Sequence, residues 1–252
     1  MRTYDQYVRA EWSLFCNNPD RAQAVIAAVN GMEINQVLDI GCGAGQELLP
    51  FVDCKSAFGV ALDIEPEVGR AGRDLFASIN PNIRVAFVRG GAEALPFTSG
   101  SFDVVVCRLA LPYTNNNKTI VEIARVLRTE GRVFLKIHHL RYYVRDLQKS
   151  ITSLNLPLLV HTIRVLLAGC FYRITGYQPR NFPSSETFQT LSLLRKELLK
   201  AGLLIVGEMK DSNPLTPSFV IVREGIGIQH DQNNLRTSLQ ERNPSDISVE
   251  AK

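Results

Sequence analysis

A glycine-rich loop and two acidic residues are the first features of this sequence that could do chemistry. The segment Asp39-Ile40-Gly41-Cys42-Gly43-Ala44-Gly45 follows a short apolar run. Glycines let the chain turn sharply and let a ligand approach the main chain closely. If a helix begins after the loop, its unpaired N–H groups favour electron-rich ligand atoms. Asp63 follows the loop at roughly the 20-residue distance at which an acid accepts hydrogen bonds from ribose hydroxyls. The pattern therefore predicts a site for a ligand that contains ribose.

The glycine spacing and Asp39 restrict the charge of that ligand. Glycine occupies every second position of the loop, and Gln46 stands where a dinucleotide-binding loop carries Gly or Ala. A carboxylate at Asp39 would repel a pyrophosphate and would suit an ammonium or sulfonium group. A nicotinamide-dependent oxidoreductase is therefore disfavoured, and the glycines taken alone leave open a plain tight turn with no ligand.

Alternating apolar and helical segments must position these residues. Seven short apolar runs predict strands, and segments with helical periodicity separate most of them. This alternation implies right-handed βαβ units and a parallel sheet, which is an α/β fold class. The last two strands are joined by a turn-rich loop and could pair antiparallel. The predicted strands are 37–40, 57–62, 84–88, 103–107, 132–137, 203–208 and 219–223, and the predicted helices are 11–30, 67–79, 118–127 and 185–201.

Some residues fix the expected ends of these helices. Asn18 or Asp20 would cap the first helix, with Pro19 in its first turn. Gly131 would take the C′ position after the helix over 118–127, and Gly202 would stop the helix over 185–201.

Four segments in a fixed order resemble the motifs of a known family. Val37–Gln46, "VLDIGCGAGQ", resembles the first motif of class I S-adenosylmethionine-dependent methyltransferases, and Gly59–Glu67 is similar to the second. Gly90–Leu111 resembles the third and fourth, and Ile123–Ile137 the helix and strand that follow. The resemblance covers residues 20–138 and, more loosely, 185–223, and is closest to the branch that methylates small molecules and lipids. It implies a Rossmann-like, doubly wound, mostly parallel seven-stranded sheet with an antiparallel last strand, and S-adenosyl-L-methionine as cofactor.

The resemblance also implies a role for individual residues along these motifs. The implied cofactor-binding residues are Gly41, Cys42, Gly43 and Gly45 in the loop beneath the methionine part, Asp39 at its amino group, Asp63 at the ribose, Ile64 against the adenine, Ala92 and Glu93 at the adenine edge, and Arg108 and Leu109 near the methionine and the sulfonium.

The sequence departs from the family pattern in three places. Gly91 stands where this branch often has Asp, so a side-chain contact to the adenine is lost. Thr129-Glu130-Gly131 replaces a Pro-Gly-Gly turn, which affects the turn alone. Pro112-Tyr113 stands where family members often place a histidine pair. The acceptor site is therefore the least defined part of the prediction.

His138 and His139 are the candidate catalytic residues. They follow the fifth strand, and ligands of open α/β sheets bind at the carboxyl ends of the strands. A histidine there could act as a base toward a hydroxyl acceptor. The alternative is that the pair merely ends a strand or caps a helix.

Aromatic and cysteine side chains give further candidates. Tyr4, Tyr7 and Trp12 could form a lid over the cofactor, and ordinary packing explains them equally well. Cys42 and Cys107 are expected to be small buried apolar groups, not nucleophiles.

Residues 140–182, after the fifth strand, form a helical and basic insertion. They contain six basic residues and one acid, Asp146. Apolar residues between 156 and 174 share one helical face, which is too short and too interrupted to span a bilayer. We expect either a cap over the acceptor site, a dimer surface, or an interfacial helix in peripheral contact with a membrane.

Charge, cysteine spacing and the first residues argue against several other classes of protein. The net charge of +3 is too small to argue for nucleic acid. The five cysteines are scattered without a Cys-x-x-Cys pair, so the sequence suggests no zinc or other metal site and no disulfide framework. This cysteine usage favours a reducing, cytoplasmic compartment. Peripheral contact with a membrane is left open. The first residues are polar and show no apolar signal core.

We therefore predict a single methyltransferase domain over residues 1–223, with the insertion at 140–182 and a disordered tail over 224–252. The expected activity is methyl transfer from S-adenosylmethionine to a small-molecule or lipid-like, amphipathic acceptor. The alternative is a non-catalytic S-adenosylmethionine-binding or interaction protein that keeps the fold. The oligomeric state is left open.

Overall fold

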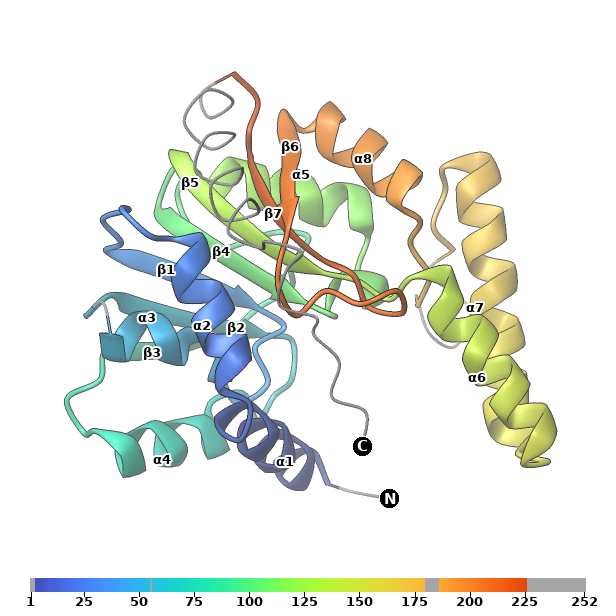
Figure 1. Ribbon diagram of the computed structural model, residues 1–252, viewed down its shortest axis with the longest axis horizontal. Helices are drawn as coiled ribbons and strands as arrows, with labels where there is room; N and C mark the ends of the chain where they lie inside the picture. The colour runs from blue at the N-terminus through green and yellow to red at the C-terminus, as the bar shows by residue number, and fades with distance from the viewer. Residues whose placement is uncertain (1–2, 55, 180–185, 226–252) are drawn as a thin grey trace, which may run out of the picture.

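The computed structural model describes residues 3–54, 56–179 and 186–225. Within them the chain forms one seven-stranded sheet with the order β3-β2-β1-β4-β5-β7-β6 (Figure 1). Strands β1 to β5 run parallel, and β7 pairs antiparallel with both β5 and β6. This confirms the predicted fold class. The strands are β1 (Gln36–Ile40), β2 (Phe58–Asp63), β3 (Val85–Arg89), β4 (Phe102–Arg108), β5 (Leu127–Lys136), β6 (Leu203–Glu208) and β7 (Ser218–Arg223).

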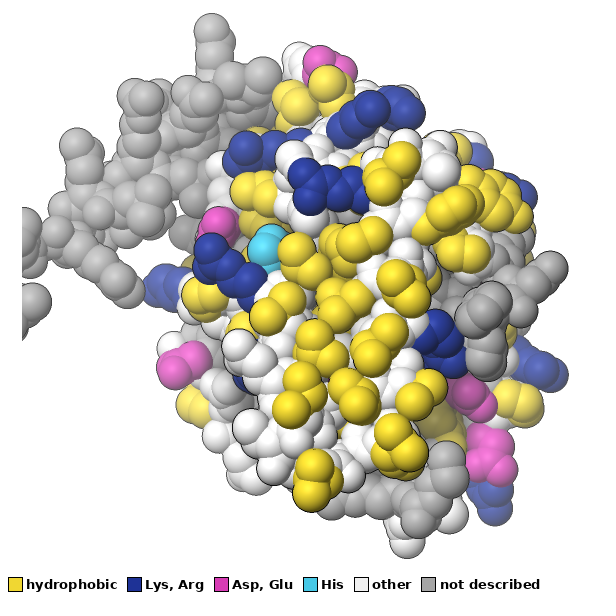
Figure 2. Space-filling model, turned by 90° about the vertical axis from the view of Figure 1, so that its right-hand side faces the viewer, with side chains coloured by type: hydrophobic (Ala, Val, Ile, Leu, Met, Phe, Trp, Pro, Cys, Tyr) yellow, Lys and Arg dark blue, Asp and Glu magenta, His cyan; other side chains and the backbone are white. Residues whose placement is uncertain are grey.

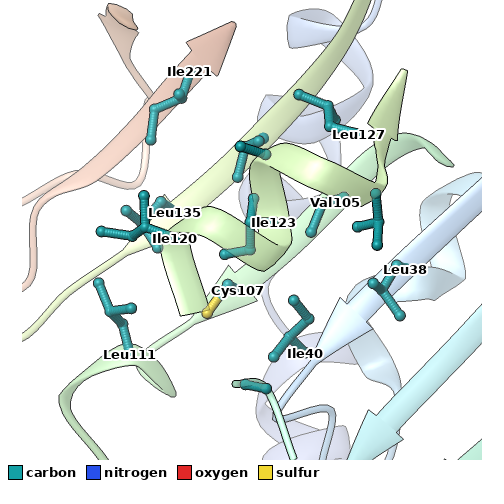
Figure 3. Packing of buried hydrophobic residues seen from close by; sticks show 14 of the residues in the cluster. Leu38, Ile40, Val105, Cys107, Leu111, Ile120, Ile123, Leu127, Leu135 and Ile221 are labelled. Atoms are coloured by element: carbon teal, nitrogen blue, oxygen red, sulfur yellow. The ribbon is translucent and has the colours of Figure 1, made fainter. Parts of the chain in front are cut away.

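Helices cover both faces of the sheet and bury two clusters of apolar side chains. One cluster joins the sheet to α1 (Tyr4–Cys16), α2 (Pro19–Ala28), α3 (Leu49–Cys54) and α4 (Arg70–Ile79). The other joins the opposite face to α5 (Asn116–Val126) and α8 (Leu191–Lys200), and Figure 3 shows side chains of α5 such as Ile120 and Ile123 packed over β4 and β5. Because β1 and β4 lie between the two clusters, most of their residues are buried on both faces, which explains why both strands are mostly apolar.

The expected helix over 11–30 is two helices. Thr3 caps α1 through a capping box with Gln6, so this helix begins earlier than predicted. The chain then breaks at Asn17 and Asn18, because Pro19 cannot donate a backbone hydrogen bond and is tolerated only in the first turn of the second helix. Asn18 is the N-cap residue of α2, although its side chain makes no capping hydrogen bond.

Two other predicted helix ends were wrong. The helix α5 ends at Val126, and Gly131 lies inside β5 next to a bulge opposite Phe102 and Val104, so it is not a C′ residue. A Cβ at Gly131 would crowd Leu127 and the Asp103 carbonyl oxygen, which explains the glycine. The helix expected over 185–201 begins at Leu191, where the side chain of Thr190 caps it, and Gln189 pairs instead with His139 in an isolated bridge.

The insertion forms a hairpin of α6 (Leu140–Thr152) and α7 (Leu156–Thr175) at the end of the molecule opposite β3 (Figure 1). The turn between the helices ends at Asn155, whose side chain caps α7. By length and composition alone, α7 is long and apolar enough to cross a membrane, contrary to the expectation from the sequence. The part of the predicted disordered tail beyond Gly225 lies outside the described residues, as do the insertion residues 180–182.

The close approach of α7 to the rest of the protein gives a stability prediction. A Cβ at Gly169 would overlap the ring of Phe188, which packs with Tyr143 and Val165. Gly169→Val should therefore lower the free energy of unfolding by about 1–3 kcal/mol, as overpacking does. Urea unfolding measures this, and the matched change Cys170→Val, on the exposed side of the same turn, should stay within about 0.5 kcal/mol. Equal stability of the two variants would mean that α7 is not packed as described.

Candidate cofactor site

A pocket of about 410 Å³ opens at the carboxyl ends of β1, β2 and β4. Parallel strands place their carboxyl ends at one edge of a sheet, so the loops that follow them meet there. Ten of the eleven residues predicted to bind the cofactor line this pocket: Asp39, Gly41, Cys42, Gly43, Asp63, Ile64, Ala92, Glu93, Arg108 and Leu109.

Gly45 is the predicted residue that is not among those lining the pocket. It has a φ of 82° at the start of the short helix Gln46–Leu48, and a Cβ there would press on Phe76 and Phe87. Gly41, in contrast, lines the pocket with a φ of 69°, and a Cβ there would overlap the Ala110 side chain. The glycine spacing therefore serves both the pocket wall and the packing behind it.

The Asp63 carboxylate ties the end of β2 to the glycine loop. One oxygen accepts a hydrogen bond from the Gly43 N–H at 3.0 Å, and the other accepts one from the Glu65 N–H at 3.2 Å. Neither bond uses all the lone pairs of the carboxylate, so it can accept further bonds from a ligand. Asp63 therefore both shapes the loop and faces the pocket.

Asp39 places a second carboxyl group at the floor of the pocket. Its side chain is 1% exposed, and its Oδ2 has no hydrogen-bond partner among the described residues. Burial, and then the negative charge of Asp63, raise the pKa of Asp39 to about 7, against the opposing effect of Arg21 and Arg108. A buried carboxyl group with a free oxygen would be stabilised in its ionised form by a cationic group of a ligand.

A network of ion pairs behind Asp39 was not predicted. Arg108, at the end of β4, is 4% exposed, lies 3.1 Å from Glu47 and pairs also with Asp211. Glu47 pairs in addition with Arg21 of α2, and Asp211 with Lys136 of β5 at 2.9 Å. Although burial favours the neutral acid, Arg108 and Lys136 lower the pKa of Asp211 to about 2. Glu47 and Asp211 therefore balance the positive charge of Arg108, although Arg108 also lines the pocket.

One weak indication of this network is present in the sequence. Glu47 and Arg108 are charged residues that border apolar runs, and such groups stay buried only when they are paired. Which groups pair with them depends on helices and loops far apart in the chain, so the partners could not be found from the sequence.

The aromatic residues of α1 divide between the pocket and the core. Tyr4 and Tyr7 line the pocket, and burial raises the pKa of both phenols. Trp12 packs edge-on against Phe76 in the core. The two tyrosines therefore belong to the pocket wall, whereas Trp12 packs in the core, and a lid formed by Tyr4 and Tyr7 stays a prediction.

The two candidate cysteines are buried, as expected. Cys42 lines the pocket and Cys107 lies in the core, with exposures of 2% and 0%. Burial raises the pKa of both thiols, that of Cys107 to about 12. Because the thiolate is the nucleophile, neither residue is suited to covalent catalysis near neutral pH.

The structure gives both candidate histidines partners outside the pocket. The His138 ring stacks on Tyr142 with 4.3 Å between ring centroids and lies 3.3 Å from the Tyr143 hydroxyl. Burial lowers the pKa of His138. The ring of His139 accepts a hydrogen bond from the Arg141 N–H and so caps α6. Neither histidine is among the described residues that line the pocket, so a role as base stays a prediction without support from this geometry.

The hairpin α6–α7 does not cover the described pocket, because none of its residues lines it. Its base is nevertheless tied to the pocket wall. Gln178, just after α7, accepts a hydrogen bond from the Asn116 N–H at 3.0 Å and donates one to the Thr114 carbonyl at 2.6 Å. Thr114 and its neighbour Tyr113 both line the pocket.

Comparisons with known proteins agree with this site. A family model described as a methyltransferase domain matches residues 37–131, which carry most of the pocket wall. YcgJ, an uncharacterised methyltransferase of Bacillus subtilis, is 37% identical over 107 residues, or 42% of this chain and 41% of that protein. The ubiquinone/menaquinone biosynthesis C-methyltransferase UbiE of a Marinomonas strain is 33% identical over 104 residues, or 40% of this chain and 41% of the relative. The matched part thus spans about two fifths of these relatives.

Solved structures share the fold. The crystal structure of YcgJ superposes with a TM-score of 0.53 at 23% identity, covering 75% of this chain and 70% of YcgJ. PKMT2 of Rickettsia typhi, solved in complex with AdoHcy, gives a TM-score of 0.59 at 14% identity and covers 86% of this chain and 55% of its own. The sheet order, the pocket at its carboxyl edge and the matched motifs together show that residues 37–131 carry a methyltransferase domain with the fold of the class I S-adenosylmethionine-dependent methyltransferases.

Proposed function

We propose that this protein transfers a methyl group from S-adenosyl-L-methionine to a small-molecule or lipid-like acceptor. The observation that carries the proposal is the pairing of two carboxyl groups, Asp39 and Asp63, beside the glycine loop in one pocket. When bound, the cofactor supplies a methyl group activated by a sulfonium. The volume of about 410 Å³ is within the usual range for a small-molecule site.

The residues of the pocket fit this cofactor. Asp39 has a buried oxygen without a partner among the described residues, which suits the ammonium group of the methionine part, and Gly41 lines the pocket with a positive φ that glycine adopts readily. Asp63 has lone pairs left for the ribose hydroxyls after its bonds to the loop. Ile64 and Ala92 would lie against the adenine. These residues hold and orient the cofactor and exclude water, which is the main contribution that an in-line transfer requires.

A second cavity of about 440 Å³ shares Glu11, Arg21, Arg108 and Leu109 with the first. We assign the acceptor to this side, because Arg108 and Leu109 stand where the family resemblance puts the sulfonium. The cavity is also lined by Lys136, Lys210 and Asp211, so it suits a polar head of the acceptor. This is compatible with an amphipathic acceptor whose apolar part stays outside the cavity.

One observation favours a second candidate, a binding protein without catalysis. No histidine is found among the described residues that line the pocket, so a hydroxyl acceptor would have no imidazole base there. An acceptor that attacks through a nitrogen or an activated carbon needs no such base. Mass spectrometry of extracts incubated with the protein and cofactor labelled in the methyl group decides between the two, since a binding protein would label nothing.

Ligand binding tests the cofactor directly. The full chain should bind S-adenosylmethionine and S-adenosylhomocysteine and should not bind NAD, because Asp39 repels a pyrophosphate. Isothermal calorimetry with each ligand measures this. Tight NAD binding without any response to S-adenosylhomocysteine would overturn the proposed function.

Replacement of Asp63 tests the ribose contact. Hydrogen bonds to a charged acceptor contribute about 1.5–3 kcal/mol, so Asp63→Ala should weaken S-adenosylhomocysteine binding at least about tenfold. Asp63→Asn, which keeps an acceptor for the Gly43 N–H, separates loss of the loop contact from loss of charge. Asp74→Ala, on the exposed surface of α4, is the matched control and should bind normally. A folded Asp63→Ala protein with unchanged affinity would contradict the assignment.

The raised pKa of Asp39 predicts a pH dependence. The folded-state pKa of about 7 lies above the ordinary value near 3.9, so the stability linked to this group is fully present below about pH 4 and is lost as the pH rises through 7. Without ligand, the free energy of unfolding of the wild type should therefore fall relative to that of Asp39→Asn between pH 4 and 7. Urea unfolding across this range measures the difference.

The same group links cofactor binding to proton release. A cationic ligand group beside Asp39 favours its ionised form, so binding of S-adenosylhomocysteine near pH 6.5 should release protons, and the Asp39→Asn protein should release fewer. Calorimetry in buffers with different ionisation enthalpies counts these protons. Equal proton release by both proteins would show that Asp39 does not meet the ligand's charge.

A further inference from the structure

The outer face of α7 carries a continuous stripe of exposed apolar side chains. Successive members lie three or four residues apart, so they share one side of the helix. Their exposed fractions run from 43% to 83%, and Figure 2 shows such side chains gathered over the middle of this end of the molecule. We call this set the α7 stripe: Leu156, Val160, Ile163, Leu167, Phe171 and Ile174.

Packing within the protein does not account for the α7 stripe. The opposite side of α7, with Thr162, Val165, Gly169 and Tyr172, is the side buried in the fold. The stripe is prolonged at the turn by Leu154, which is 91% exposed. An apolar surface of this extent is rare on a protein without a partner and marks an interaction site.

Basic side chains accompany the stripe. The two helices carry five Lys or Arg residues, and Asp146 is the one acid within residues 140–175. Arg141, Lys149 and Arg173 are exposed, and in Figure 2 Lys and Arg side chains stand at the margins of the apolar area. A second copy of the chain would bring like charges together, whereas an anionic lipid surface would complement them.

The contacts between α7 and the rest of the protein indicate that the helix lies on the surface of a bilayer and does not cross it. Although the helix has 20 residues and passes for a span by composition, its inner side packs on Phe188 and its Tyr172 hydroxyl donates a hydrogen bond to Glu197 of α8. A span would have to break the bond between Tyr172 and Glu197 and expose the Tyr172 hydroxyl to lipid, at the cost of an unpaired polar group. An interfacial helix keeps them in place.

We propose that the α6–α7 hairpin is a membrane-binding arm that lays the α7 stripe into the surface of an anionic bilayer. The apolar side chains enter the boundary between headgroups and acyl chains, and Arg141, Lys149 and Arg173 contact lipid phosphates. Hydrogen bonds from Gln178 to Thr114 and from the Thr187 N–H to the Pro112 carbonyl join the base of the arm to the segment that lines the cofactor pocket. The arm thus holds the pocket close to the bilayer, and this binding does not depend on methyl transfer.

Sedimentation of the full chain with vesicles tests the proposal. The protein should pellet with vesicles of phosphatidylcholine and phosphatidylglycerol at low salt, much less with phosphatidylcholine alone, and less at high salt because salt screens the charges. Recovery in the supernatant under all conditions would overturn the proposal, and so would equal pelleting with both vesicle types at every salt concentration.

Two sets of variants test the two parts of the surface. Val160→Gln/Leu167→Gln/Ile174→Gln should abolish pelleting, because these exposed side chains supply the apolar contact. Arg141→Gln/Lys149→Gln/Arg173→Gln should lower partition into anionic vesicles by about a hundredfold, since each basic residue near such a surface contributes about fivefold.

Matched controls lie on the exposed side of α8, outside the arm. Leu199→Gln replaces an apolar residue that is 51% exposed, and Arg195→Gln/Lys196→Gln/Lys200→Gln removes the same number of exposed positive charges. Both control proteins should pellet like the wild type, and each variant is compared after urea unfolding shows that it is folded. Loss of pelleting in the controls, or its retention in the arm variants, would contradict the proposal.

Sedimentation equilibrium in the absence of lipid tests the alternative that the α7 stripe binds a second copy of the chain. A chain that uses the α7 stripe to bind lipid should be monomeric at the concentrations of the vesicle assay. A stable dimer that Leu167→Gln dissociates, with no vesicle binding, would assign the stripe to a second copy and overturn the membrane proposal.

Discussion

The pairing of β1 with β2 on one side and with β4 on the other determines where the polar groups of the pocket lie. All three strands are parallel and contribute side chains to both apolar clusters, so a shift of one residue would move every side chain of a strand to the opposite cluster and disrupt the packing of both. With the register fixed, Asp39 and Asp63 come together at one edge, and the bond from the Gly43 N–H to Asp63 closes the loop between them. The geometry of the cofactor site is thus a consequence of strand pairing.

The buried charges near this edge are costly to desolvate, and the network around Arg108 offsets that cost by pairing. Glu47 and Asp211 balance Arg108, while Arg21 and Lys136 extend the network to α2 and β5. Loss of one partner would leave an uncompensated buried charge, which destabilises far more than the pair stabilises. The network also sets the electrostatic environment of Asp39, since Arg21 and Arg108 oppose the effects of burial and of Asp63 on its pKa.

The α6–α7 hairpin combines two surfaces with different requirements. Its inner side is held by Gly169 against Phe188 and by the Tyr143 hydroxyl, which donates a hydrogen bond to Glu186 at 2.7 Å. Its outer side exposes large apolar residues to solvent. Exposure of apolar surface to water is unfavourable, and a helix that served packing alone would not need these residues on its outer side. The base of the hairpin reaches the wall of the pocket through Gln178.

The sequence by itself determined the sheet, the glycine loop and most of the pocket wall, because these depend on local periodicity and on residues that follow strands directly. Ten of the eleven predicted cofactor residues line the pocket for that reason. The wrong predictions concerned helix ends, because Pro19 and Thr190 act through local backbone geometry that hydrophobic periodicity does not reveal. Only the tertiary structure decided which charges pair with Arg108, that His138 and His139 are not among the described residues that line the pocket, and which side of α7 faces solvent. These outcomes depend on contacts between segments distant in the chain, such as Arg108 with Asp211 and Gly169 with Phe188, and on burial that no local pattern specifies.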